Sequence, residues 1–262
     1  MATIHATAVV DPRARVADDA EIGPYVVIEG EVEIGAGCIV GAFCRFEGPT
    51  VIGAGNRFVS YCSIGAPPQD LKYRGEPTRL EIGPNNTFRE FVTIHRGSPG
   101  GGGITRLGAR GLYMVGAHVA HDCQVGDHVI FANAGTLAGH VHVGDHATIG
   151  ALTAVHQFCS VGEYAFLGGG TIATKDCLPF MKTVGSRPAR CFGPNSVGLE
   201  RNGFSEERRE AIKRAWRLLH SPRLTTTEAK TRIGDELGSA PDAARLLEFM
   251  NASQRGVILA RG

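Results

Sequence analysis

The chain has 262 residues, enough for one large domain or two smaller ones, and 43% of them are hydrophobic. A formal net charge of +1 argues against a nucleic-acid-binding protein, which usually carries a strong basic excess. No apolar stretch approaches the roughly 20 residues that span a bilayer, and the N-terminus lacks the basic and apolar regions of a secretory signal. We therefore expect a cytoplasmic protein with no integral membrane segment and no nucleic-acid partner.

An apolar residue recurs at every sixth position through most of the chain. The first run extends from Ile4 to Ile64 and the second from Leu107 to Leu167, and neither has an exception. This period predicts a mainly β fold, the hexapeptide parallel β-helix, in which three six-residue faces make one coil of eighteen residues. Residues eighteen apart then stack, about 4.8 Å from one another.

Two stretches interrupt the repeat. Residues 65–79 contain three prolines and must leave the helix as a loop, and the glycine-rich residues 97–104 form a second excursion. Long excursions from a compact repeat are usually functional or disordered. The polar side chains of the first loop favour a functional role.

Helical patterns replace the six-residue period in the last third of the chain. Ser205 is placed to cap one helix, Thr225 begins the capping box of a second, and Asp242 is expected to cap a third. We therefore expect a β-helix over residues 1–190 and a small α-helical domain over residues 191–262.

Six of the seven cysteines share one slot of the repeat, four residues after an apolar rung. Other coils fill this slot mostly with Ala, Val, Thr or Gly, so it is a packing position in which a free cysteine behaves as a small hydrophobic side chain. Disulfide and metal-binding roles are not expected for these six residues. They are Cys38, Cys44, Cys62, Cys123, Cys159 and Cys177.

Seven of the ten histidines lie between residues 118 and 156. Counted by position within the eighteen-residue coil, four of them are expected to converge on one corner of three successive coils. These four are His118, His121, His140 and His156. Gly139 and Gln157 share the position of His121 and should stack on it. The other three are interpreted as solvated, and they are His128, His142 and His146.

Three functions compete for this corner. A zinc lyase of the γ-carbonic anhydrase type would bind its metal through three histidines, but Asp122 and Gln157 are better suited to orienting and binding. A neutral imidazole is suited to removing a proton from a hydroxyl nucleophile at cytoplasmic pH. A non-catalytic scaffold would leave the cluster idle. We favour general base catalysis without a metal.

Several short motifs carry a resemblance to a known family. They are QDLKY at 69–73, GEPTR at 75–79, TIHRG at 93–97, HVAHDC at 118–123, LAGH at 137–140 and AVHQF at 154–158. Together they resemble the UDP-N-acetylglucosamine O-acyltransferases, which open lipid A biosynthesis in Gram-negative bacteria, and the resemblance covers nearly the whole chain. It implies a left-handed β-helix, a homotrimer, and transfer of a 3-hydroxyacyl chain from acyl carrier protein to the 3-hydroxyl of UDP-N-acetylglucosamine. No metal or cofactor is implied, because a thioester is already activated.

The resemblance also implies a role for individual residues. His121 would be the general base, Asp122 would orient it, and the backbone amide of Gly139 would stabilise the oxyanion, a contribution of about 3 kcal/mol. Gly169 would end the acyl-chain groove and leave room for a long chain. The substrate-binding residues would be Gln69, Asp70, Lys72, His118, His140, His156, Gln157, Asn195 and Arg201. The first three of these would reach in from a neighbouring subunit.

Two positions depart from the family pattern. Val197 stands where a Glu is frequent, and Asn202 replaces the second of two adjacent arginines, so both weaken the nucleotide contacts that the resemblance implies and leave fine substrate specificity open. An amino group in place of the sugar 3-hydroxyl stays open as the acceptor. The related N-acyltransferase stays a further alternative, although it normally begins with a separate uridine-binding domain. The segment 182–217 carries nine basic and four acidic residues, a local +5 that could attract an acidic acyl carrier protein.

Overall fold

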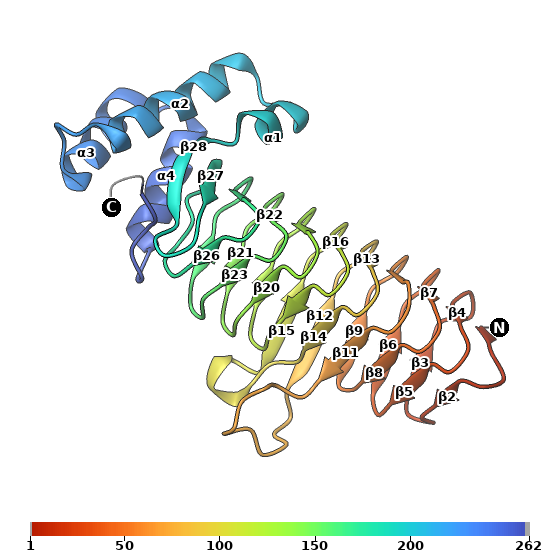
Figure 1. The fold of residues 1–262 in the computed structure, drawn as a ribbon. Coiled ribbons are helices and arrows are strands. Elements are labelled where there is room, and N and C mark those ends of the chain that lie inside the picture. The colour runs from red at the N-terminus through yellow and green to blue at the C-terminus, as the bar shows by residue number, and fades with distance from the viewer. Residues whose placement is uncertain (1, 260–262) are drawn as a thin grey trace.

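Short strands wind into three sheets that run the length of an elongated, left-handed parallel β-helix (Figure 1). The computed structural model describes residues 2–259. The three sheets contain 11, 9 and 8 strands and are called sheets A, B and C below. Each coil contributes one strand to each sheet, so the rungs of all three sheets enclose a single core.

Neighbouring strands within each sheet come from successive coils. Sheet A contains β1 (Thr3–Ile4), β4 (Glu21–Ile22), β7 (Ile39–Val40), β10 (Arg57–Phe58), β13 (Thr87–Phe88), β16 (Leu112–Tyr113), β19 (Ile130–Phe131), β22 (Thr148–Ile149), β25 (Phe166–Leu167), β27 (Met181–Val184) and β28 (Arg190–Pro194). Sheet B contains β2 (Val9–Val10), β5 (Val27–Glu29), β8 (Arg45–Glu47), β11 (Ser63–Ala66), β14 (Thr93–His95), β17 (His118–Val119), β20 (Thr136–Leu137), β23 (Ala154–Val155) and β26 (Ile172–Ala173). Sheet C contains β3 (Arg15–Val16), β6 (Val32–Ile34), β9 (Thr50–Ile52), β12 (Arg79–Ile82), β15 (Ile104–Leu107), β18 (Gln124–Val125), β21 (His142–Val143) and β24 (Ser160–Val161).

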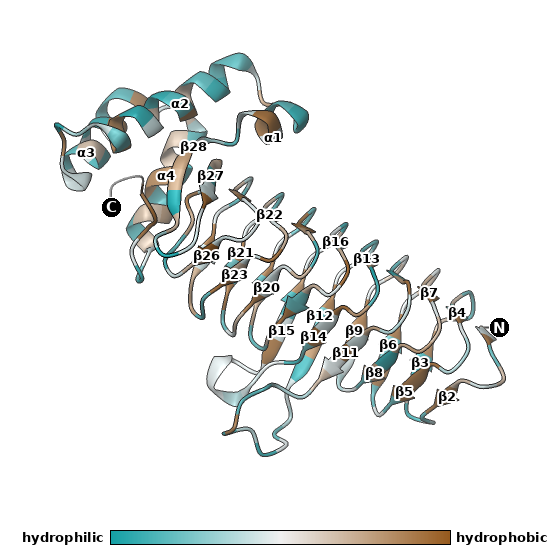
Figure 2. Cartoon of the chain, in the orientation of Figure 1, coloured by the Kyte–Doolittle hydropathy of each residue, from teal (hydrophilic) through white to brown (hydrophobic). Residues whose placement is uncertain are grey.

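The register confirms the eighteen-residue coil. Val119 of β17 lies opposite Leu137 of β20, which in turn lies opposite Val155 of β23. All three side chains are buried, and Figure 2 shows apolar segments recurring along the strands of successive coils. The six cysteines of the packing slot are free and buried, as predicted, and so is Cys191.

Both excursions leave the helix where they were expected, but each is slightly shorter. The first covers residues 67–78 and the second residues 96–103, which include the short 3₁₀ helix η1 (Pro99–Gly101). The last residue expected in each excursion belongs to a strand instead, because Arg79 of β12 already pairs with Ile104 of β15.

Four helices follow the β-helix and pack at its C-terminal end (Figure 1). They are α1 (Ser196–Arg201), α2 (Glu206–His220), α3 (Thr226–Leu237) and α4 (Pro241–Ala252). The predicted caps of α2 and α3 are confirmed: the Ser205 side chain accepts from the N–H of Arg208, and Thr225 with Glu228 forms a complete capping box. Within residues 2–259, no helix has both the length and the apolarity of a membrane span.

The prediction that Asp242 caps α4 is wrong. Pro241 occupies the first helical position, where its fixed φ is favourable, so Ala240 is the N-cap residue. Asp242 lies inside the first turn and is buried. Arg208 of α2 donates two hydrogen bonds to its carboxylate, at 2.9 and 2.7 Å, so Asp242 joins two helices instead of ending one.

Two elements near residue 190 were not predicted. The strands β27 and β28 form an antiparallel hairpin that extends sheet A, and β28 continues past residue 190 to Pro194. The six-residue helix α1 then begins, with Asn195 as its cap. The sheet therefore continues through the expected boundary between the two regions.

The C-terminal segment returns to close the last coil. Ile258 is buried in the core of the β-helix, and its N–H donates to the carbonyl oxygen of Asp176 at 2.8 Å. The hydroxyl of Ser253 donates to the Asp176 carboxylate at 2.5 Å. The final apolar rungs are thereby covered by the end of the same chain.

Candidate active site

Two successive turns at the corner between sheets B and C hold the predicted catalytic residues. His121 and Asp122 follow β17, whereas Gly139 and His140 follow β20 one coil later. Asp122 and His140 both have a φ of 61°, the left-handed conformation that the tight turn requires. The repeated turn geometry places the two pairs on top of each other.

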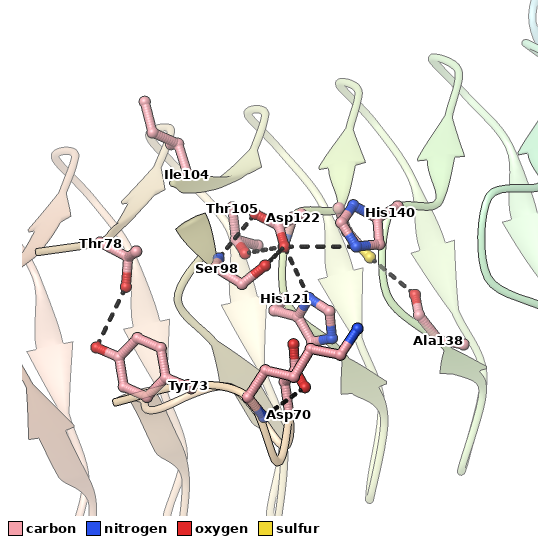
Figure 3. A network of polar contacts seen from close by, with 12 residues as sticks. Asp70, Tyr73, Thr78, Ser98, Ile104, Thr105, His121, Asp122, Ala138 and His140 are labelled. Carbon is pink, nitrogen blue, oxygen red and sulfur yellow. Dashed lines mark hydrogen bonds and ion pairs between the residues drawn. The ribbon is translucent and has the colours of Figure 1, made fainter. Parts of the chain in front are cut away.

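His121 and Asp122 form a hydrogen-bonded pair (Figure 3). The Nδ1 atom of His121 lies 2.7 Å from Oδ2 of Asp122, whose side chain has 0% exposure. Burial acts to raise the pKa of Asp122, but hydrogen bonds from His121 and Ser98 outweigh it and hold that pKa below its ordinary value. An ionised carboxylate only accepts, so Nδ1 of His121 carries the proton and Nε2 is left as a basic nitrogen.

Gly139 lies directly against the ring of His121, as predicted. A Cβ at residue 139 would lie 2.6 Å from Cε1 and 2.8 Å from Nε2 of His121. Within residues 2–259, the Gly139 N–H donates to no acceptor. A backbone donor is thus available beside the basic nitrogen.

His140 packs against both the pair and the next coil. Its ring is perpendicular to His121 at 5.1 Å between centroids and stacks on Phe158 at 4.4 Å. Its Nε2 atom lies 3.8 Å from Oδ2 of Asp122. Burial lowers the pKa of His140, and nearby His121 adds to this effect. Asp122 and Asp70 oppose it but do not cancel it, so the neutral imidazole is favoured.

His118 lies on the same face and contacts a histidine that sequence analysis missed. His118 shares a 2.7 Å hydrogen bond with Thr93, and its ring meets that of His95 edge-on at 5.0 Å. Burial, followed by the charges of His118 and His121, lowers the pKa of His95 to about 4. The Nδ1 atom of His95 is buried and has no partner among the described residues.

The excursion at residues 96–103 explains why His95 was missed. It inserts extra residues between β14 and β17, so Thr93 lies opposite His118, twenty-five residues away rather than eighteen. Counting in steps of eighteen residues therefore does not bring His95 beside His118. The signal that could have found it was the TIHRG motif itself.

The first excursion contributes Asp70 to the site within a single chain. Asp70 acts electrostatically on His140, and its carboxylate accepts from the backbone N–H of Lys72 at 2.9 Å. Asp70 thus lies within electrostatic reach of His140 of its own chain, and the expectation that this loop reaches in from a neighbouring subunit stays a prediction. Gln69 and Lys72 are exposed on the same loop.

His156 and Gln157 lie farther along the β-helix. Both are exposed, and His156 contacts the backbone oxygen of Gln157 at 3.1 Å. Within residues 2–259, neither has a hydrogen bond or ring contact to the His121 pair. All four histidines lie at the same corner on three successive coils, as predicted, but His156, one coil beyond His140, is not in contact with the His121 pair.

Asn195 and Arg201 line a cavity of about 990 Å³ at another corner, between sheets C and A. His128 and His146, which were interpreted as solvated, also line it, and their rings stack at 4.6 Å. His128 is exposed, which agrees with that interpretation, whereas His146 is half-buried and also stacks on Tyr164 at 4.6 Å. Asn195 donates to the carbonyl oxygen of Tyr164 at 3.0 Å, so its amide also anchors α1.

Gly169 and His142 lie at two other places on the β-helix. Gly169 is exposed in the turn after β25, where a Cβ would have only the Ala151 carbonyl oxygen nearby, at 3.3 Å. His142 lines a separate cavity of about 680 Å³ between sheet C and α4.

The donor atoms of His121, Asp122 and His140 lie within 4.8 Å of one another, close enough to reach one metal ion. Both oxygens of Asp122 already accept from Ser98, at 2.8 and 2.5 Å, and Nδ1 of His121 is turned to the same carboxylate. The atoms that would bind the ion are thus engaged with each other. This arrangement favours proton transfer over metal ligation.

Much of the basic charge expected to attract a partner is paired internally. Arg208 bonds Asp242, Arg214 lies 3.6 Å from Glu236, and Arg217 lies 3.1 Å from Glu210. Within the described residues, Lys182 and Arg201 form no ion pair and face the larger cavity. Arg187 and Arg190 likewise form no ion pair within the described residues, so only part of the unpaired positive charge lies beside that cavity.

Comparison with known proteins adds an independent observation. The family described as Udp N-acetylglucosamine O-acyltransferase, domain 2, matches residues 176–258. The acyl-[acyl-carrier-protein]--UDP-N-acetylglucosamine O-acyltransferase of Syntrophobacter fumaroxidans is 47% identical over 255 residues, covering 97% of this chain and 99% of that protein. The protein of the same description from Thiobacillus denitrificans is 48% identical over 258 residues, covering 98% and 100%.

Solved structures agree over the same length. The UDP-N-acetylglucosamine acyltransferase of Francisella novicida superposes with a TM-score of 0.95 at 33% identity, covering 99% of this chain and 95% of that one. The UDP-N-acetylglucosamine O-acyltransferase of Moraxella catarrhalis gives 0.94 at 40% identity, covering 97% and 99%.

Proposed function

The chain belongs to the acyl-[acyl-carrier-protein]--UDP-N-acetylglucosamine O-acyltransferase family, and we propose that His121 is the general base of its reaction. The protein is an enzyme that moves an acyl chain from acyl carrier protein to UDP-N-acetylglucosamine, the first step of lipid A biosynthesis. The observation that carries the proposal is the His121 ring, held at 2.7 Å by a fully buried carboxylate.

The proposed reaction follows from the two nitrogens of His121. Nε2 removes the proton from the sugar 3-hydroxyl as its oxygen attacks the thioester carbonyl carbon. Asp122, which accepts the Nδ1 hydrogen of His121, stabilises the imidazolium that forms when Nε2 takes up this proton. When the tetrahedral intermediate collapses, the carbon–sulfur bond breaks, and the imidazolium returns its proton to the departing thiolate of the carrier protein.

Gly139 supplies the other half of the proposed chemistry. Negative charge develops on the carbonyl oxygen of the thioester, and a fixed backbone donor beside the attacking group stabilises it. The free N–H of Gly139 lies next to the His121 ring, which supports this role. His118, His140 and Asp70 surround the same place and are proposed to bind the sugar.

The nucleotide end of the substrate is proposed to lie against Asn195 and Arg201. These residues line a cavity at a different corner from His121, which supports a site shared between copies of the chain. We propose a homotrimer in which one chain contributes the His121 corner and its neighbour contributes the cavity. Gln69, Lys72, His156 and Gln157 then face the same cleft.

The acyl chain and the location of the enzyme complete the proposal. A 3-hydroxyacyl chain on acyl carrier protein is proposed as the donor, with the exposed Gly169 at the end of its groove. A cytoplasmic location stays a prediction. An acceptor with a 3-amino group stays an alternative, because an imidazole base serves either nucleophile.

The test is an acyl-transfer assay of the purified protein. UDP-N-acetylglucosamine is supplied with 3-hydroxyacyl carrier proteins of several chain lengths, with and without a chelator. His121→Ala is compared with His142→Ala, which removes an exposed imidazole from a separate cavity. Turnover that survives chelation, is lost in His121→Ala and is kept in His142→Ala supports the proposal.

Other outcomes would overturn parts of it. Full activity of His121→Ala would remove the general base. Turnover only with the 3-amino sugar would change the acceptor. Turnover lost on chelation and restored by zinc would favour a metal-dependent reaction instead.

A further inference from the structure

The glycine-rich excursion at residues 96–103 covers the carboxylate of Asp122 (Figure 3). Ser98 donates its backbone N–H to Oδ1 at 2.8 Å and its hydroxyl to Oδ2 at 2.5 Å. On the other side, the N–H of Asp122 donates to the Thr105 hydroxyl at 2.8 Å. One residue of the excursion thus holds both oxygens of the carboxylate.

The Ser98 side chain bonds Asp122 instead of capping the short helix that it precedes. Ser98 is the N-cap residue of η1, a position at which serine usually bonds the helix backbone, yet it makes no side-chain cap here. It is only 3% exposed. Its hydroxyl is therefore committed to the carboxylate.

The glycine at residue 101 lets the backbone lie on the same carboxylate. A Cβ there would be 2.1 Å from Cγ of Asp122 and 2.4 Å from each of its oxygens. One residue earlier, a Cβ on Gly100 would have no atom within 4 Å. Contact with Asp122, rather than chain flexibility alone, thus accounts for glycine at residue 101.

We propose that Ser98 is a positioning residue for the reaction: it fixes the plane of the Asp122 carboxylate and thereby the direction of the His121 base. This proposal rests on the proposed role of His121. A carboxylate bonded only to the histidine could rotate about its terminal torsion, which is broad and soft. The two bonds from Ser98 restrict that rotation and keep Nε2 of His121 aimed at the acceptor hydroxyl.

The first test compares Ser98→Ala with Ser98→Thr in the full-length enzyme. Loss of one hydroxyl bond to a buried charge is expected to lower kcat roughly 10- to 100-fold, with KM for UDP-N-acetylglucosamine nearly unchanged. Ser98→Thr keeps the hydroxyl and should recover most of the rate. Equal kcat in Ser98→Ala and wild type, or a loss confined to KM, would overturn the proposal.

The second test uses neighbouring glycines. Gly101→Ala places a methyl group on the carboxylate and should lower kcat, whereas Gly100→Ala is the matched control and should leave it unchanged. Melting temperatures of all variants are measured as well. A purely structural effect would lower the melting temperature together with kcat, whereas loss of positioning lowers kcat alone. Equal kcat in the two glycine variants would contradict the proposed contact.

The third test asks whether Ser98 acts through Asp122. In an Asp122→Asn background the Ser98→Ala substitution should cost less than about twofold, because the positioned group is already gone. An undiminished loss there would place the effect of Ser98 elsewhere. If His121→Ala is fully active, the general base itself fails; if His121 is essential but Ser98→Ala is normal, only the present inference fails.

Discussion

Gly139 presents its bare Cα to the imidazole of His121, because a Cβ at residue 139 would lie 2.6 Å from Cε1 of that ring. The glycine therefore determines where the base can lie, in addition to offering its backbone N–H. Gly139→Ala should move the ring and lower kcat on the order of 100-fold. Circular dichroism and melting temperature should stay close to wild type, with Gly234→Ala on α3 as the control. A normal kcat in the Gly139→Ala enzyme would contradict this account.

A second prediction concerns the two corners of the site. His121→Ala and Arg201→Ala chains should each be inactive or nearly so alone. If neighbouring chains share each site, denaturing and refolding them together should restore part of the activity, because mixed assemblies contain sites with both residues intact. Kinetic assay of the mixture checks this. Mixtures no more active than the separate variants would place the complete site within one chain.

A third prediction concerns stability in acid. Burial lowers the pKa of His95 from 6.5 to about 4. The folded state therefore binds a proton at His95 less readily than the unfolded state does. Stability from this group is complete above pH 6.5 and is lost as the pH falls through about 4, a change of about 3 kcal/mol. Urea unfolding between pH 7 and pH 4 measures it. His95→Gln should flatten this dependence, and an unchanged slope would contradict the prediction.

The Arg208–Asp242 pair separates two roles for Asp242. A capping aspartate tolerates replacement by asparagine, whereas a buried carboxylate that joins two helices does not. Asp242→Asn should destabilise the fold by about 1–2 kcal/mol, because it weakens two charge-assisted hydrogen bonds to a half-exposed Arg208. Chemical denaturation of Asp242→Asn and the exposed control Asp235→Asn measures the difference. Equal stability of the two variants would show that the bonds between Asp242 and Arg208 contribute nothing to the fold.

The last prediction concerns the length of the acyl chain. Gly169 is exposed, and a Cβ there would lie 3.3 Å from the Ala151 carbonyl oxygen, so Gly169→Met should obstruct a groove that ends there. Preference should move to shorter 3-hydroxyacyl chains, since each methylene excluded from apolar contact costs about 0.8 kcal/mol. Competition between carrier proteins of different chain length measures the preference. An unchanged preference would place the end of the groove elsewhere.

Most of the β-helix could be predicted because a six-residue period records burial directly. Every stacked contact at His121, Gly139 and His140 follows from that count. An insertion before His118 changes the count, and for that reason the contact between His118 and His95 was not predicted. Short elements such as α1 have too few residues to show a period, and Pro241 shifted the cap that a simple pattern assigned to Asp242. Ser98 carried no signal, because its partner is defined only by the path of the excursion.

The two excursions rejoin the ladder with one local register shift, between Ile64 and Ala66: Ile64 still lies opposite Ile94, and Ile94 opposite Val119. Chain length at these corners is therefore independent of the rest of the architecture. Residues can be gained or lost there during descent while every later coil keeps its place. A lineage can thus reshape what surrounds the base without rebuilding the scaffold that holds it.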